Sequence, residues 1–295
     1  MFKQLTILPY DLKGPPGTGK TLVAKAVATE CGLPFLSIKG PELLGSYVGE
    51  SEANLRGVFQ SAREAAEQNA PVSASILFFD ELDSLAPKRG GVGDGGGVME
   101  RVVATLFAEL DGDTAASSTG RVFVMGATNR PDLLDPSLLR PGRLDRSVYL
   151  GIATDPAERA RILAAQLHKL KLDGGALEVS IQVESKLPPR LTGADFSTIA
   201  SGALLQAVER LCRQADEEHL AALTAGQQGV EIHDILKSWD SEKCTPTVLL
   251  EDLLEAAKNV APSVTQEELD RYERLKEQYS AIETGPIEHE GDIFY

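Results

Sequence analysis

Eight residues near the start of the chain constrain its fold more than any other stretch. They are Gly14, Pro15, Pro16, Gly17, Thr18, Gly19, Lys20 and Thr21, and they match the phosphate-binding loop pattern Gly-x-x-x-x-Gly-Lys-Ser/Thr. Such a loop joins a strand to a helix. Its glycines let backbone N–H groups wrap phosphates without Cβ clashes, and the helix N-terminus favours anions. The pattern therefore predicts an α/β fold built around a nucleotide phosphate site.

The residue types in this loop also predict roles. Lys20 can reach the β- and γ-phosphates of a nucleotide, and the Thr21 hydroxyl can hold Mg²⁺. We expect ATP to contact Gly14, Pro15, Pro16, Gly17, Thr18, Gly19, Lys20, Thr21 and Leu22. The alternative is a chance glycine-rich turn before a helix, and the two motifs that follow along the chain argue against it.

The second motif is an apolar run that ends in two acids. Residues 76–79 are Ile, Leu, Phe and Phe, and Asp80 and Glu81 follow directly. A buried parallel strand that ends at a ligand site has this form. We expect Asp80 to bind Mg²⁺, through water, and Glu81 to polarise the attacking water. A core strand followed by a solvated acidic turn would give the same letters.

The third motif again places polar residues after an apolar strand. Residues 122–128 run into Asn129, which is placed to orient water, and Arg140 and Arg143 follow at a spacing of three. An arginine offered to a neighbour's γ-phosphate stabilises the charge of the transition state, by about 10³–10⁵ in rate. Taken alone, the segment could be a surface turn with two solvated arginines.

Together these motifs resemble an AAA-type ATPase module, and the resemblance covers about residues 14–280. It implies six-membered rings with the nucleotide between neighbouring subunits. It also implies Glu81 as the catalytic base, Asn129 as a sensor, and Arg140 and Arg143 as arginine fingers that act in trans. The site would then be incomplete in a monomer.

The resemblance also suggests what such a ring does. The loop of residues 45–50 precedes a helix expected to begin near Ser51, with Ser51 as its N-cap. An aromatic residue between two glycines usually faces solvent or a partner, and the family places Tyr47 and Val48 in a central-pore loop that grips polypeptide. In isolation Tyr47 would more often be a packed loop aromatic. Residues 88–97 are glycine-rich and correspond to a second pore loop, or to a plain connection.

Composition narrows the class of partner. The chain has 295 residues, a formal net charge of −15 and a pI of about 4.8, which argues against nonspecific nucleic-acid binding. No apolar run approaches the roughly 20 residues of a membrane span. The three cysteines, Cys31, Cys212 and Cys244, are scattered and indicate free thiols in a reducing compartment. The four histidines form no metal-spaced cluster.

The first part of the chain alternates strands and helices. We expect strands near residues 5–8, 35–38, 76–79, 122–126 and 147–150, and helices near residues 21–30, 51–67 and 98–110. This alternation predicts an α/β P-loop NTPase fold, a doubly wound parallel sheet spanning residues 1–152. All three motifs then fall at the carboxyl ends of strands, where ligands bind in such sheets.

The rest of the chain predicts a small all-helical lid domain over residues 153–282. Pro156 opens a helix that Asp155 caps. Another helix begins after Thr192, and in the AAA family its residues Gly193 and Ala194 lie near the nucleotide base. Residues 223–247 are turn-rich and predict a surface insertion, and residues 283–295 predict a flexible acidic tail.

A finer resemblance is to the peroxisome-biogenesis branch of the family. It rests on the segments at residues 96–103, 148–151, 187–196 and 261–264. It implies a hetero-hexamer with a sibling AAA ATPase, bound through a membrane anchor protein to the cytosolic face of the peroxisome. The implied substrate is the ubiquitinated import receptor, pulled back to the cytosol. The runner-up is a ubiquitin-dependent segregase of the valosin-containing-protein group.

The start of the chain departs from the family pattern. Only 13 residues precede the phosphate loop, so we expect an N-terminally truncated module with weaker ATP affinity than intact relatives. Residues 8–13 contain proline and charges, which suit a central strand poorly. Two non-motor alternatives follow: a nucleotide-binding ring subunit without its own turnover, and a nucleotide switch that never assembles. The paired arginines, which have no obvious use within one subunit, argue against the switch.

Overall fold

The computed structural model describes residues 10–47, 49–88, 97–113, 120–140, 142–225, 231–240 and 243–283. The chain divides into two compact units, Met1–Gly151 together with Gln266–Tyr295, and Ile152–Thr265. The predicted lid of residues 153–282 is thus divided, because its last helix, α9 (Gln266–Glu283), is grouped with the first unit.

The first unit is built on a five-stranded parallel sheet. Its strands are β1 (Tyr10–Lys13), β2 (Phe35–Lys39), β3 (Ala74–Asp80), β4 (Arg121–Thr128) and β5 (Arg146–Tyr149), in the order β2-β3-β4-β1-β5. All four pairings are parallel. The predicted α/β fold and four of its five predicted strands are confirmed. Because β1 lies between β4 and β5, the loop that leaves β1 emerges next to the carboxyl end of β4, with β3 one strand further.

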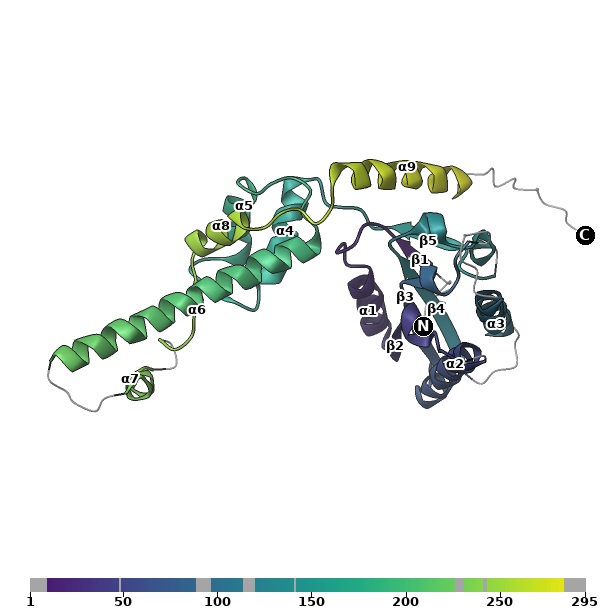
Figure 1. Ribbon diagram of the computed structural model, residues 1–295, viewed down its shortest axis with the longest axis horizontal. Coiled ribbons are helices and arrows are strands. Elements are labelled where there is room, and N and C mark those ends of the chain that lie inside the picture. The colour runs from purple at the N-terminus through teal and green to yellow at the C-terminus, as the bar shows by residue number, and fades with distance from the viewer. Residues whose placement is uncertain are drawn as a thin grey trace, which may run out of the picture. The chain divides into compact units, whose positions relative to one another are not determined.

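Helices cover both faces of this sheet (Figure 1). Helix α1 (Lys20–Cys31) packs on one face, and α2 (Glu50–Gln68) and α3 (Val98–Asp113) pack on the other. The alternation of β3 supplies both cores: Ile76 and Phe78 pack toward α1, whereas Leu77 and Phe79 pack toward α2 and α3. All four side chains are fully buried, which is why this strand is an unbroken apolar run.

The strand that feeds the phosphate loop is not where the apolar pattern predicted it. The predicted strand at residues 5–8 lies outside the described residues, and β1 is formed by the polar segment Tyr10–Lys13. Our expectation that this segment suits a central strand poorly is wrong. Its charges are tolerated because the Nζ of buried Lys13 lies 3.4 Å from Oδ2 of Asp11 and donates a hydrogen bond to Ser147 Oγ at 2.9 Å. Asp11 itself is completely buried, and burial raises its pKa to about 6.

This buried carboxyl predicts how stability depends on pH. The pKa of Asp11 rises from 3.8 to about 6 on folding, so folding favours the protonated form. Its contribution to the free energy of unfolding is about 3 kcal/mol. This contribution is fully present below about pH 4 and is lost as the pH rises through about 6. We expect Asp11→Asn to remove this dependence. The difference between the denaturation midpoint of the variant and that of the unmodified chain should therefore shift in favour of the variant as the pH rises from 5 to 7.5. The comparison uses the trend with pH, because the variant also removes the partner of Lys13. Parallel profiles for the two proteins would contradict the prediction.

The second unit consists mainly of helices. They are α4 (Pro156–Leu167), α5 (Ala176–Glu184), α6 (Gly193–Thr224), α7 (Ile232–Ser238) and α8 (Leu250–Lys258), with two short paired strands, β6 (Lys171–Leu172) and β7 (Thr247–Val248). The predicted cap of α4 forms, since Asp155 accepts a hydrogen bond from the Glu158 N–H, and Thr192 caps α6 by accepting one from the Asp195 N–H. The helices enclose a core of their own, which includes Leu163, Val183, Phe196, Ile199 and Leu253.

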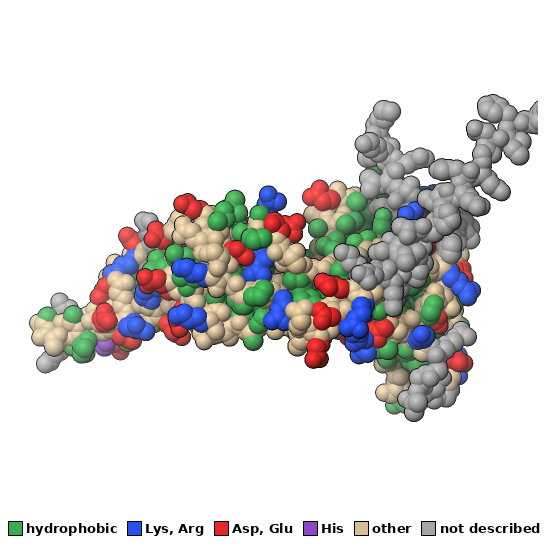
Figure 2. All heavy atoms as spheres, turned by 90° about the horizontal axis from the view of Figure 1, so that it is seen from above, with side chains coloured by type: hydrophobic (Ala, Val, Ile, Leu, Met, Phe, Trp, Pro, Cys, Tyr) green, Lys and Arg blue, Asp and Glu red, His purple; other side chains and the backbone are tan. Residues whose placement is uncertain are grey.

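The predicted insertion at residues 223–247 contains a packed helix, α7. Ile235 and Trp239 bury against Ala215 of α6, and the indole N–H of Trp239 donates to Glu218 at 2.8 Å. Lys243 lies over the Trp239 ring, 4.4 Å from its centroid. On the face drawn in Figure 2, acidic and basic side chains alternate along the described surface. In the part of the chain that the structure describes, no helix is both long enough and apolar enough to cross a membrane.

Candidate active site

The phosphate loop has the backbone shape that its glycines predict. Gly14, Gly17 and Gly19 have φ values of 147°, 76° and 90°, which L side chains rarely adopt. A Cβ on Gly14 would lie 2.1 Å from the carbonyl oxygen of Leu150, so this position cannot carry a side chain. Gly19 is the N-cap of α1, and the first turn of that helix has no acidic residue. The loop therefore presents an open helix N-terminus suited to phosphate.

Lys20 is held inside the loop. Its Nζ donates hydrogen bonds to the carbonyl oxygens of Gly14 at 2.9 Å and Pro15 at 2.7 Å. Burial lowers the pKa of Lys20 to about 8, against the opposing effect of Asp80. A buried cation with a lowered pKa gains from an anion that replaces its lost solvation. The lysine is thus arranged to be stabilised by phosphate.

Two predicted Mg²⁺ ligands meet across the sheet edge. The Thr21 hydroxyl donates to Oδ2 of Asp80 at 2.9 Å, although the two residues are 59 positions apart. A hydroxyl and one carboxylate are oxygen donors of the kind that Mg²⁺ prefers, since it is held by few protein ligands and keeps several waters. The donor set therefore fits Mg²⁺ bound together with nucleotide phosphates. Among the described residues there is no cluster of three or more His, Cys, Asp or Glu that suggests another metal.

Glu81 lies on an unusual turn at the end of β3. Its φ is 54° and its ψ is 47°, the left-handed region that non-glycine residues rarely adopt. Ser84 Oγ donates to the Glu81 carbonyl at 2.8 Å, and a Cβ on Gly40 would lie 2.6 Å from that same oxygen. The conformation is therefore imposed by its neighbours. The carboxylate of Glu81 is exposed, so it is accessible to water at the site.

Asn129 follows β4 and lies beside a second polar link, which joins the end of β4 to the turn after β3. Thr128 Oγ1 donates to Asp83 Oδ1 at 2.6 Å and accepts from the Arg130 N–H at 2.9 Å. The Asn129 Oδ1 atom is buried, and no described residue donates a hydrogen bond to it. Since β4 pairs with β1, the asparagine is carried next to the strand that feeds the phosphate loop.

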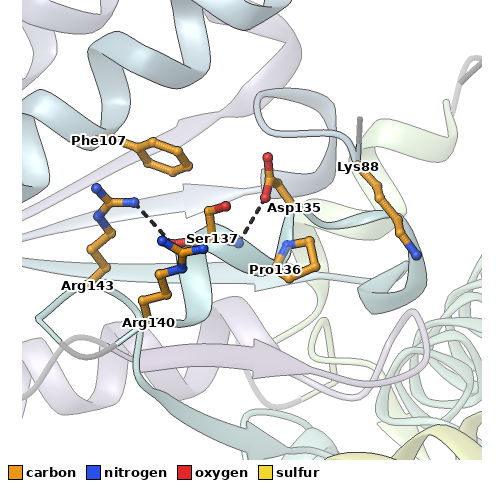
Figure 3. Close-up of a pocket in the computed structure, with 7 residues that line it drawn as sticks. All are labelled: Lys88, Phe107, Asp135, Pro136, Ser137, Arg140 and Arg143. Atoms are coloured by element: carbon orange, nitrogen blue, oxygen red, sulfur yellow. Dashed lines mark hydrogen bonds between the residues drawn. The ribbon is translucent and has the colours of Figure 1, made fainter. Parts of the chain in front are cut away.

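The two predicted arginine fingers have different surroundings. They line one cavity of about 540 Å³, together with Lys88, Phe107, Asp135, Pro136 and Ser137 (Figure 3). Arg143 is held within the subunit: it donates to both carboxylate oxygens of Asp111, at 2.9 and 2.7 Å, and its guanidinium lies 3.9 Å from the centroid of the Phe107 ring. A third bond joins Arg143 to the Ser137 carbonyl at 3.1 Å. Arg140 is exposed and makes no side-chain hydrogen bond with the described residues.

The remaining predicted residues belong to other elements or lie outside the described residues. Tyr47 is 79% exposed, and its N–H donates to Glu50 Oε2 at 3.1 Å. Val48, and residues 89–96 of the predicted second pore loop, lie outside the described residues. Gly193 and Ala194 begin α6 in the second unit. The structure thus brings the phosphate loop, Asp80, Glu81 and Asn129 to one edge of one sheet.

The predicted cap of α2 is wrong. The helix begins at Glu50 with Gly49 as its N-cap, and Ser51 lies inside it. The Ser51 hydroxyl instead accepts a hydrogen bond from the Gly45 N–H at 2.9 Å. Glu50 and Ser51 together therefore hold the loop that carries Tyr47, which is a role no N-cap pattern suggests.

Three residues near the site escaped the sequence reasoning. Asp111 holds Arg143 from 32 positions away, and Phe107 lies under the same guanidinium. Tyr272 of α9 donates to the backbone carbonyl of Asn129 at 2.6 Å, across 143 positions. No local pattern announces such contacts. The one available signal was the presence of two tyrosines, Tyr272 and Tyr279, in a largely polar helix.

A comparison with known families agrees with this geometry. Residues 11–152 match the family described as "ATPase family associated with various cellular activities (AAA)". The chain therefore belongs to the AAA ATPases, with ATP as their nucleotide, and its first unit is the P-loop domain of that class.

Three similar proteins carry the same name. The chain is 49% identical over 270 residues to "Peroxisomal ATPase PEX6" of Cricetulus griseus. The matched segment covers 92% of this chain and 24% of the relative. Its human counterpart is 48% identical over the same shares, and that of Neurospora crassa is 45% identical over 99% of this chain and 21% of its own length. The chain thus spans about a quarter of the length of the curated relatives it matches.

Proposed function

We propose that this chain is the motor module of a peroxisome-biogenesis ATPase, which uses ATP hydrolysis to thread or extract polypeptide. The observation that carries the proposal is that the phosphate loop lies next to Asp80 and Glu81 at the end of β3. The hydrogen bond from Thr21 to Asp80 joins the two segments. Similarity to proteins named as peroxisomal ATPases supports the cellular role.

Each residue has a role in the proposed reaction. The loop N–H groups and Lys20 bind and orient the phosphates, and Thr21 and Asp80 hold Mg²⁺, which supplies charge neutralisation when bound. Glu81 takes a proton from the attacking water, and Asn129 orients that water. Arg140 of one subunit stabilises the γ-phosphate charge in its neighbour. Gly193 and Ala194 contact the nucleotide base.

The partners follow from the same resemblance. The chain works in a hetero-hexamer with a sibling AAA ATPase, held at the cytosolic face of the peroxisome by a membrane anchor protein. Its substrate is the ubiquitinated import receptor, returned to the cytosol. The highly exposed Tyr47 supports a gripping role in the central pore, because a large aromatic that is left in solvent loses the energy of burial unless a partner covers it.

The test of the proposal is Mg²⁺-ATP turnover per subunit at increasing protein concentration. A site completed by a neighbour's arginine gives turnover per subunit that rises with concentration as rings form. A flat turnover per subunit would contradict the trans arrangement. Tight ATP binding without turnover at any concentration, with or without a sibling ATPase, would instead favour a nucleotide-binding subunit that does not hydrolyse.

The pore-loop role predicts a separable effect of Tyr47→Ala. The side chain is exposed and its ring contacts no described aromatic residue, so its removal should leave basal ATP hydrolysis within about twofold. Polypeptide unfolding should fall at least about tenfold, because the gripping surface is lost. The measurement pairs an ATPase assay with unfolding of a tagged fluorescent substrate. A loss of basal hydrolysis would point to a packing role for the ring.

A further inference from the structure

Helix α9 returns to the first unit and contacts the loop that follows β4. Tyr272 is 8% exposed, and its hydroxyl donates to the backbone carbonyl oxygen of Asn129 at 2.6 Å. Burial raises the pKa of Tyr272, so the hydroxyl stays protonated and remains a donor throughout the physiological range. Tyr149 of β5 is close enough to Tyr272 and Glu273 that, after burial, their charges raise its pKa further. The helix therefore contacts the loop that follows β4 and lies near β5 (Figure 1).

A second contact holds the same loop three residues later, at Asp132. Arg271 donates to Asp132 Oδ2 at 2.6 Å, and Arg130 lies 3.7 Å from that oxygen. Both arginine side chains are about half exposed, so these ion pairs are screened by solvent and contribute little. The partly buried hydrogen bond of Tyr272 is the stronger constraint, because its loss would leave a backbone carbonyl without its protein donor.

The bond acts on the residue that the proposed function assigns to orienting the attacking water. Asn129 carries a buried Oδ1 atom to which no described residue donates, so this oxygen is left to accept a hydrogen bond from a water. The direction of that amide depends on the backbone from which it projects. A misplacement of about 1 Å in a group that orients a reactant can cost about 100-fold in rate.

We propose that Tyr272 is a positioning residue for ATP hydrolysis: its hydroxyl fixes the Asn129 backbone and thereby aims the Asn129 side chain. The inference deepens the proposed function and rests on it. The second unit, Ile152–Thr265, is followed directly by α9, so the helix that holds Asn129 is also the continuation of that unit's chain. The orientation of the asparagine is thus tied to a segment far from the nucleotide motifs in sequence.

The test is Tyr272→Phe in the full chain, under assembly conditions that give turnover. The variant removes one oxygen and keeps the buried ring. We expect kcat to fall about tenfold, while KM for ATP and the Kd of ATP stay within about twofold, because the phosphate loop is untouched. Amide hydrogen exchange in residues 126–133 should accelerate in the same variant, whether or not nucleotide is present.

Two variants control for general damage. Tyr10→Phe makes the same chemical change in β1, where no described residue bonds the hydroxyl, and Arg271→Met removes only the exposed ion pair. Both should keep kcat within about twofold. If Arg271→Met lowers kcat as much as Tyr272→Phe, docking of α9 rather than the hydroxyl is responsible and the inference is overturned. If the unmodified chain shows no turnover, the proposed function fails. The hydrogen-exchange measurement does not depend on turnover, so unchanged amide exchange in residues 126–133 of Tyr272→Phe would overturn the inference by itself.

Discussion

Arg140→Ala is expected to lower ATP turnover in the assembled ring by about 10³–10⁵ and to leave ATP binding by a subunit unchanged. Arg140 is exposed and its side chain bonds no described residue, so it is available to a neighbouring subunit. The measurement is single-turnover hydrolysis beside equilibrium ATP binding. Retention of more than about a tenth of the turnover would contradict a role at the γ-phosphate.

Arg143 should behave differently because it already has partners. Two hydrogen bonds to Asp111, one to the Ser137 carbonyl and the Phe107 ring hold it in place. The hydrogen bond from Arg143 lowers the pKa of Asp111, so the pair stays ionised at neutral pH. We interpret Arg143 as the anchor of the loop that presents Arg140. Its replacement by alanine should therefore lower turnover and thermal stability together, whereas Arg140→Ala should leave thermal stability unchanged.

Mixed rings provide a direct test of action in trans. A subunit with Arg140→Ala keeps its own Glu81, and a subunit with Glu81→Gln keeps its own Arg140. At an interface where the first binds ATP and the second is its neighbour, every catalytic group is present. Mixing the two inactive proteins should restore part of the turnover. Failure to restore any turnover in confirmed mixed rings would mean that Arg140 acts within its own subunit.

Glu81→Gln is expected to lower turnover by about 10²–10⁴ while ATP binding persists. The amide has the shape of the carboxylate and cannot accept the proton of the attacking water. Lys20 and Thr21, to which the proposed function assigns the phosphates and Mg²⁺, lie on a different element, α1, so ATP binding should be retained. Because Glu81 sits in a turn with positive φ that its neighbours impose, the substitution changes the side chain and not the backbone.

A matched control makes the same carboxylate-to-amide change elsewhere. Glu30 is exposed near the end of α1 in the same unit, and Glu30→Gln should leave turnover within about twofold. Both variants are compared by single-turnover hydrolysis and by ATP binding. Loss of ATP binding in Glu81→Gln would indicate that the carboxylate supports the site rather than the chemistry.

The parts of the fold that could be predicted are those with a local cause. Four strands and the helices after the phosphate loop could be predicted from the spacing of apolar residues along the chain. In residues 76–79, for example, both faces of the strand are buried, so every residue is apolar. The exception is β1, where Asp11 and Lys13 are buried against each other. A pair of opposite charges in a central strand looks like a surface segment in sequence, and only the packing of β4 and β5 on either side makes it a strand.

The candidate site divides in the same way. The phosphate loop, Asp80 and Glu81 could be recognised because their chemistry requires fixed residue types at fixed spacings. The different surroundings of Arg140 and Arg143 could not, because Asp111 and Phe107 come from another helix. The grouping of α9 with the first unit also had no local signal.

The sequence by itself determined the fold class, the nucleotide motifs and their order, because backbone conformation at glycines and apolar periodicity are short-range properties. Only the tertiary structure decided which side chains share a hydrogen bond across tens of residues: Thr21 with Asp80, Arg143 with Asp111, and Tyr272 with Asn129. Those contacts depend on how separate elements pack into one interior. Packing is a property of the whole chain, since each buried group must find its partner among every element that surrounds it.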